Sequence, residues 1–234
     1  MRRRLLVLPA LAALSFALPS FAATPPAPQV VDPAGDANGS ANAVYDESAP
    51  VGNQAYADVT SILWKTTTKT SKVKKKTVTT VTGFTVTLTL SGPPTAPTGT
   101  EVVYRALGTP PCPGGGTSAF FGVVYYTQPD ANGVNPQSAL RDNCTGATRL
   151  TPIALPVIAG NTITWTVPLS VVPADTKVKA GTTLTGLWFE TREIENFPSG
   201  VCFPAPVPTY GGSCGLGAGT LDNSQAGTAT YTLK

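Results

Sequence analysis

The sequence contains no histidine among its 234 residues. This absence excludes Ser-His-Asp and Cys-His catalysis, zinc and haem sites with histidine ligands, and imidazole proton transfer near neutral pH. Sustained helical patterns are also missing, and Gly and Pro, at 23 residues each, interrupt the chain throughout. The composition therefore excludes coiled-coil and long-helix proteins and favours short strands joined by turns.

The first 22 residues have the pattern of a secretory signal peptide. Three arginines at 2–4 precede an apolar run from Leu5 to about Leu18, and Ser20-Phe21-Ala22 is a small-x-small cleavage site. The apolar run is shorter than the roughly 20 residues of a transmembrane helix, which favours cleavage over a retained anchor. We therefore expect a secreted, extracellular protein with a single domain over 23–234.

Cleavage would leave 13 basic against 13 acidic residues, a net charge near zero that predicts no binding to nucleic acid or to anionic membranes. The positive charge is nevertheless concentrated, because six of the nine lysines fall within twelve residues: Lys65, Lys69, Lys72, Lys74, Lys75 and Lys76. Threonine and valine alternate with them, which predicts a hairpin. Such a ribbon could bind an anionic polymer, or its lysines could simply prevent edge-to-edge association of sheets, which is the interpretation we favour.

The four cysteines are Cys112, Cys144, Cys202 and Cys214. An even number in a secreted protein predicts two disulfides, and three pairings are possible. We favour Cys112 with Cys144 and Cys202 with Cys214, because the shortest loops close most easily. A four-cysteine metal site is disfavoured, since the sequence has no CxxC spacing.

Alternation of apolar residues with threonine gives the clearest secondary-structure signal, in GFTVTLTLS at 83–91 and NTITWTVPL at 161–169. Further strands are expected at 58–67, 73–81, 101–107, 118–127, 182–191 and 227–233. Turn-forming residues separate these segments. The predicted fold is all-β, a two-sheet antiparallel β-sandwich, Ig-like or jelly-roll-like, with long disulfide-bearing loops.

Oxygen donors are concentrated in VVDPAGDANG at 30–39, and Asp58 precedes a predicted strand. Calcium takes six to eight oxygen ligands, which carboxylates, amides and backbone carbonyls of a glycine-containing loop can supply. Asp32, Asp36, Asn38 and Asp58 are therefore candidate ligands for a structural Ca²⁺ ion. The alternative is an Asx-turn loop in which these side chains bind their own backbone without a metal.

Four segments carry a resemblance to a known family: VVDPAGDANG at 30–39, DVTSILW at 58–64, ITWTVPLS at 163–170 and LDNSQAGTATYTL at 221–233. They resemble secreted bacterial β-sandwich domains of the glucodextranase C-terminal or DOMON-like group, which is similar to family 9 carbohydrate-binding modules. The resemblance implies a β-sandwich with a structural calcium site near Asp32 and Asp36. The lysine-rich insertion at 65–76 and the two cysteine-bearing loops depart from the group.

Aromatic residues at 120–126 and 188–189 could form a platform for sugar rings. The candidates are Phe120, Phe121, Tyr125, Tyr126, Trp188 and Phe189, of which Tyr125, Tyr126 and Trp188 are assigned to ligand binding. In the segment 118–127, apolar residues occupy both odd and even positions, which face opposite sides of a strand. The alternative is therefore a strand that is buried on both faces. Trp64 and Trp165 are expected in the core.

Glu190, Glu193 and Glu195 are the carboxylates that could serve glycoside hydrolysis, which needs two carboxyl groups across the scissile bond. Their spacing matches no hydrolase motif, and Arg192 offers an ordinary salt bridge. We therefore predict a non-catalytic binding module for carbohydrate or a cell-surface polymer. A structural or adhesion protein of the cell envelope is the alternative, and a hydrolase that uses Glu190 or Glu193 is the third hypothesis.

Overall fold

The chain folds into two antiparallel β-sheets, as the computed structural model describes for residues 26–37, 53–95, 100–112, 119–128, 136–196, 216–224 and 227–234. The strands are β1 (Val30–Val31), β2 (Val59–Val73), β3 (Lys76–Leu90), β4 (Thr100–Thr109), β5 (Phe121–Tyr126), β6 (Ser138–Asp142), β7 (Arg149–Pro152), β8 (Val157–Ala159), β9 (Thr162–Pro168), β10 (Thr183–Asn196), β11 (Leu216–Asn223) and β12 (Tyr231–Thr232). Two short 3-10 helices, η1 (Leu169–Val171) and η2 (Ala174–Thr176), follow β9. No helix in these ranges is long and apolar enough to cross a membrane.

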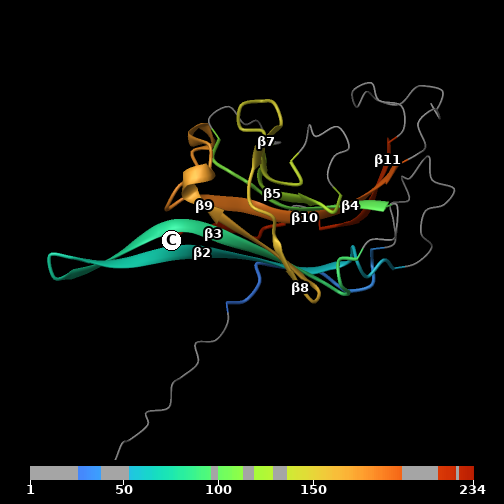
Figure 1. Ribbon diagram of the computed structural model, residues 1–234, viewed down its shortest axis with the longest axis horizontal. Coiled ribbons are helices and arrows are strands. Elements are labelled where there is room, and N and C mark those ends of the chain that lie inside the picture. Colours follow the sequence, from blue (N-terminus) through green and yellow to red (C-terminus); the bar gives the residue numbers. More distant parts are fainter. Residues whose placement is uncertain are drawn as a thin grey trace, which may run out of the picture.

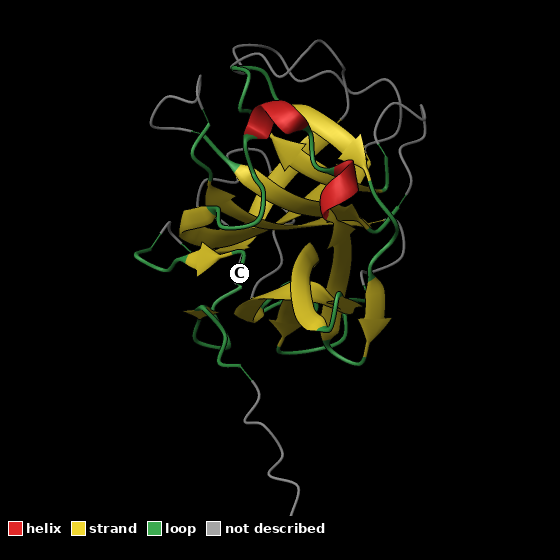
Figure 2. Ribbon diagram, turned by 90° about the vertical axis from the view of Figure 1, so that its left-hand side faces the viewer, coloured by secondary structure: helices red, strands yellow, loops and turns green. Residues whose placement is uncertain are grey.

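The sheets lie face to face (Figures 1 and 2). The five-stranded sheet has the order β1-β2-β3-β9-β8, and the seven-stranded sheet has the order β11-β10-β4-β5-β6-β7 with β12 paired to β10. One hydrophobic core contains residues of both sheets, and the rings of Phe84 on β3 and Phe121 on β5 meet across it at 6.1 Å. The predicted all-β sandwich is therefore confirmed.

Alternation explains why the central strands fold as they do. Val86 and Leu88 on β3 are fully buried, while Thr87 between them lies on the outer face. Trp64 and Trp165 are 1% and 0% exposed, which confirms that both belong to the core. Burying a large apolar side chain stabilises a fold by about 1.5–3 kcal/mol, so these positions contribute strongly.

Several strands differ from the predicted ranges. Most of the two predicted segments 73–81 and 83–91 forms one strand, β3, because a β-bulge beside Gly83 lets the chain continue without a turn, while Val73 is the last residue of β2. The segment 227–233 contributes only the two-residue β12. The sequence did not predict β1, β6, β7, β8 or β11, which are short or lack a clear apolar–polar alternation.

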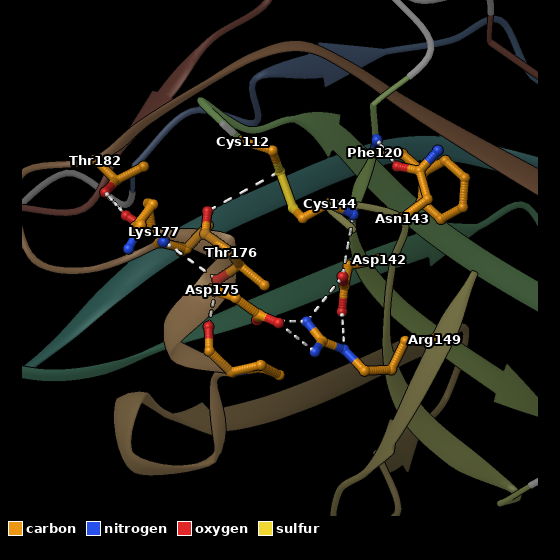
Figure 3. Close-up of a disulfide and its surroundings, with 12 residues drawn as sticks. Cys112, Phe120, Asp142, Asn143, Cys144, Arg149, Asp175, Thr176, Lys177 and Thr182 are labelled. Atoms are coloured by element: carbon orange, nitrogen blue, oxygen red, sulfur yellow. Dashed lines mark hydrogen bonds and ion pairs between the residues drawn. A yellow bond between two sulfur atoms is a disulfide. The ribbon is translucent and has the colours of Figure 1, made fainter. Parts of the chain in front are cut away.

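The predicted disulfide between Cys112 and Cys144 is confirmed (Figure 3). It joins the segment after β4 to the segment after β6, so it connects two parts of the seven-stranded sheet. Cys202 and Cys214, like the predicted signal peptide, lie outside the described residues.

Candidate functional site

Three aspartates that lie far apart in the sequence meet at one end of the sandwich. Asp32 follows β1, Asp36 lies in the next turn and Asp222 is on β11, and one carboxylate oxygen from each lies within 4.8 Å of the others. Asp58, at the start of β2, lies next to them and raises the pKa values of both Asp32 and Asp222. The predicted Asp32, Asp36 and Asp58 are thus brought together, whereas Asn38 lies outside the described residues.

We call Asp32, Asp36, Asp58 and Asp222 the acidic cluster, and side-chain hydrogen bonds hold its backbone in place. The Oδ2 atom of Asp58 accepts hydrogen bonds from the Gly35 backbone at 2.8 Å and from Asn53 Nδ2 at 2.9 Å. Asn53 Oδ1 accepts a bond from the Ala37 backbone at 3.2 Å. Gly35 has φ of 101°, a conformation that glycine adopts without strain. The side chains of Asp58 and Asn53 therefore fix the turn that carries Asp36.

Two carboxylate oxygens of the acidic cluster have no hydrogen-bond partner although they are buried. They are Oδ2 of Asp32 and Oδ1 of Asp58, and the whole Asp58 residue is 0% exposed. Burial, followed by repulsion from Asp36 and Asp58, raises the pKa of Asp32 to about 6. Burial also raises the pKa of Asp222 to about 7, with Asp32, Asp36 and Asp58 adding to it. These carboxylates therefore lie close together with no ion pair to a described residue, and their ionised forms are destabilised.

This arrangement fits a calcium ion by its donor chemistry. Calcium binds oxygen at 2.3–2.6 Å, so ligands on opposite sides of the ion lie about 5 Å apart, similar to the spacing of the three carboxylates. Asp32 belongs to the triad, and its unpartnered Oδ2 is the kind of group that a cation would satisfy, whereas the predicted ligand Asp58 is not part of the triad. Exposed acidic groups are also common without a metal. The sequence did not indicate Asp222, because only the pairing of β11 with β10 brings it to this end of the molecule.

A second group of candidate side chains lies on the outer face of the seven-stranded sheet. We call it the outer patch, and it comprises Arg105, Tyr126, Arg141, Trp188, Glu190 and Arg192. Tyr126 packs against a small hydrophobic cluster on this face, formed by Val103, Val124 and Ala139. Trp188 pairs with Leu107, and its neighbour Phe189 points into the main core, so strand alternation places Trp188 on the outer face. Both rings are half-buried.

Arginine side chains crowd around one carboxylate of the outer patch. Glu190 accepts a bond from Arg105 Nη1 at 2.6 Å and another from Arg192 Nε at 2.6 Å. Arg141 lies over the ring of Phe120, and burial, followed by the charges of Arg105 and Arg192, lowers its pKa. The Nε atom of Arg105 is buried without a hydrogen-bond partner. Arginine side chains grouped in this way are suited to bind an anionic or hydroxyl-bearing ligand, because they donate hydrogen bonds.

Tyr125 lies on the opposite face of β5 from Tyr126. Its ring stacks on Tyr104, with centroids 6.3 Å apart, and packs against the main core. Val123 and Val124 are both fully buried, so the central part of β5 is buried on its two faces, as the alternative interpretation predicted. The structure therefore brings Tyr126 and Trp188 to one face and leaves Tyr125 on the other.

The carboxylates considered for hydrolysis have different surroundings. The predicted salt bridge between Glu190 and Arg192 is confirmed, and Arg105 makes a second one. Both oxygens of Glu190 are therefore engaged by arginine. Glu193 and Glu195 lie on β10, and their side chains are outside the described part of the structure.

Comparison with known proteins adds no relative. No protein-family model, no curated protein and no solved structure matches the chain. The resemblance to glucodextranase C-terminal or DOMON-like domains therefore stays a prediction from the sequence.

Proposed function

We propose that this protein is a secreted, non-catalytic binding module for carbohydrate or a cell-surface polymer, with a structural calcium ion in the acidic cluster. The observation that carries the proposal is the outer patch, where Trp188 and Tyr126 share a sheet face with arginines. Aromatic rings stack on the apolar faces of sugars, and arginine donors bind hydroxyl or acidic groups at their edges. A rigid sheet holds these side chains in fixed positions, as a binding surface requires.

The outer patch can be tested by substitutions that remove or keep the rings. Trp188→Ala and Tyr126→Ala should weaken binding of the mature protein to whichever insoluble polysaccharide or cell-wall preparation it retains in a pull-down. Trp188→Phe and Tyr126→Phe keep a flat ring and should retain most of the binding. If the alanine and phenylalanine variants bind alike, or if all variants bind like the wild type, the assignment of the outer patch is wrong.

The calcium part of the proposal is tested separately by calorimetric titration of Ca²⁺ into chelator-treated protein. Asp32→Asn and Asp222→Asn should remove or strongly weaken binding, because each replaces a charged ligand. Asp175→Asn is a matched control, since that exposed carboxylate lies outside the acidic cluster and pairs with Arg149. Absence of a calcium signal in the wild type, or equal loss in the control, would refute the metal site.

A structural or adhesion protein is the second candidate, and one feature favours it. The edge strand β8 and Leu155, two residues before it, expose large apolar side chains: Leu155 at 59%, Val157 at 67% and Ile158 at 46%. An exposed apolar edge strand is suited to pairing with another chain. Concentration-dependent self-association in analytical ultracentrifugation that Val157→Lys abolishes would support this candidate, and a monomer at all concentrations would oppose self-association through β8.

A further inference from the structure

The hairpin formed by β2 and β3 extends beyond the sandwich. In the five-stranded sheet, β9 pairs with β3 only as far as Gly83, and β1 pairs with β2 only at Ser61 and Ile62. Residues 68–81 therefore form a two-stranded ribbon without a third strand, which projects from the body of the molecule (Figure 1). We call this ribbon the arm, and every residue from 68 to 80 in it is exposed.

The core does not explain the length of the arm. Isolated two-stranded hairpins are only marginally stable in water, because they bury little apolar surface. Here the cross-strand side-chain contacts are weak, with hydroxyl distances of 3.4 Å for Thr67 to Thr82 and for Thr70 to Thr79. The six residues of β2 beyond Thr67 span about 20 Å. A structure of this length that adds nothing to the core points to a role in contact with something outside the protein.

The charge of the arm is uncompensated. Its lysines are Lys69, Lys72, Lys74, Lys75 and Lys76, with Lys65 at the base, and all six are exposed. None of them takes part in an ion pair between described residues. The sequence has no aspartate or glutamate between 59 and 100. The arm therefore presents a concentrated positive field on a chain whose predicted mature form is close to neutral.

The turn at the tip retains lysine where other residues would be more stable. Lys74 and Lys75 have φ of 46° and 65°, the left-handed conformation of a two-residue hairpin turn. Asn-Gly is the favoured sequence there, because a Cβ atom is unfavourable in this region. The tip therefore keeps two charges against the local conformational preference, a conflict that is expected at functional positions.

The spacing of the charges suits an extended polymer. Strand alternation and the pairing of Val73 with Lys76 place Lys65, Lys69 and Lys76 on one face, in successive steps of about 13 Å. Lysines are flexible point charges, which bind repeated anionic groups without a pocket. Binding of single-stranded nucleic acid by base stacking needs exposed rings, but Trp64 and Phe84, the aromatic residues of β2 and β3, are buried. Membrane-bound segments use large apolar anchors, whereas the exposed apolar residues of the arm are Val73 and Val78.

We propose that the arm binds an extended anionic polysaccharide through its lysines. This contact surface is distinct from the outer patch and rests on different residues, so it stands even if the outer patch binds nothing. The acidic groups of the polymer would align along the Lys65, Lys69 and Lys76 face, with Lys74 and Lys75 contacting it at the tip.

The test measures affinity of the mature protein for polygalacturonate, with neutral dextran as the uncharged reference. The triple variant Lys65→Gln, Lys69→Gln, Lys76→Gln should lower affinity by about tenfold and flatten its dependence on salt. The matched control is Lys177→Gln, Lys179→Gln, Lys234→Gln, which removes the same charge from the three lysines outside the segment and should leave affinity within about twofold. Trp188→Ala removes no charge, so any loss of affinity through the outer patch should leave the salt dependence of binding unchanged, which separates the two surfaces.

A second variant separates charge from folding. Lys74→Asn with Lys75→Gly improves the turn and removes two charges, so it should bind polygalacturonate more weakly while thermal stability is kept or raised. Equal loss of affinity in the control triple would show a general charge effect and overturn the proposal. Absence of binding to polygalacturonate would also overturn it, as would tighter binding to duplex DNA or phosphatidylglycerol vesicles. Aggregation of the lysine variants with unchanged affinity would instead establish that the lysines only protect the sheet edges.

Discussion

At the scale of single residues, Arg149 connects two parts of the fold beside the disulfide (Figure 3). Its Nε and Nη2 atoms donate to the Asp142 carboxylate, each at 3.0 Å, and its Nη1 and Nη2 atoms donate to Asp175, each at 2.8 Å. Asp142 has no exposed surface, whereas the side chain of Asp175 is 47% exposed. Arg149 therefore compensates a buried charge on β6 and also fixes η2.

Replacing Arg149 with methionine should destabilise the protein by about 3 kcal/mol, because the Asp142 carboxylate would stay buried without its ion pair. Arg149→Lys should fall between the wild type and this variant, since lysine cannot donate bidentately to two carboxylates. The free energy of unfolding in urea measures the effect. Asp175→Asn is the control and should have a much smaller effect, because that carboxylate is solvated. Equal losses in the two variants would contradict this account.

The disulfide gives a second residue-scale prediction. Cys112 and Cys144 are 32 residues apart, and a crosslink over a loop of this length stabilises a fold by about 3–4 kcal/mol in the chain-entropy model. The double variant Cys112→Ser, Cys144→Ser should lose about that amount in urea unfolding, and the reduced wild type should lose at least as much. A double variant as stable as the oxidised wild type would show that this crosslink contributes nothing to stability.

At the scale of elements, the strands that alternate are the clearest predictions, and the strands that the sequence misses are short or lack a clear alternation. The alternating segment at 83–91 is recognisable because one face is buried and the other carries threonine. The edge strand β8 is apolar at every position and exposed, and the described β11 includes the run Gly217-Ala218-Gly219, so neither has a periodic signal. Their pairing is decided by neighbouring strands, which a local pattern does not contain.

Close approach of β4 and β5 depends on Gly122. A Cβ atom at this position would collide with the Ala106 carbonyl oxygen and the Leu107 Cα atom, which are backbone atoms that cannot move aside. Gly122→Ala should therefore push the two strands apart and destabilise the protein by about 1–3 kcal/mol. Ser71→Ala, on the exposed arm, is the control and should be close to neutral. Thermal unfolding compares the two, and an effect of Gly122→Ala no larger than that of the control would exclude the close approach.

At the scale of the whole molecule, the acidic cluster joins the beginning of the described chain to its end. Asp222 Oδ2 accepts a bond from the Val59 backbone at 2.7 Å, so β11 of one sheet is tied to β2 of the other. The motif at 30–39 was sufficient to indicate Asp32 and Asp36. Asp222 and the outer-patch residue Arg105 could not be found in the same way, because their partners are set by which strands become neighbours.

The raised pKa values of Asp32, about 6, and Asp222, about 7, set the pH dependence of the metal-free protein. Both groups hold a proton more tightly in the folded chain than in the unfolded chain, where aspartate ionises near pH 4. Stability in chelator should therefore fall as pH rises from about 4 through about 7. Asp222→Asn should reduce this fall, because it removes one buried charge from the acidic cluster.

Calcium should reverse this dependence, since it binds the ionised carboxylates and offsets their repulsion. At free calcium about a hundredfold above Kd, binding adds about 2.7 kcal/mol, which corresponds to a rise in Tm of about 5–10 °C for a chain of this size. Differential scanning fluorimetry at about pH 5 and about pH 8, with calcium or chelator, measures both effects. Asp222→Asn should stabilise the protein in chelator and lose the calcium-dependent rise. A wild type that is more stable at the higher pH in chelator, or whose Tm does not respond to calcium, would contradict the assignment of the acidic cluster as a cation site.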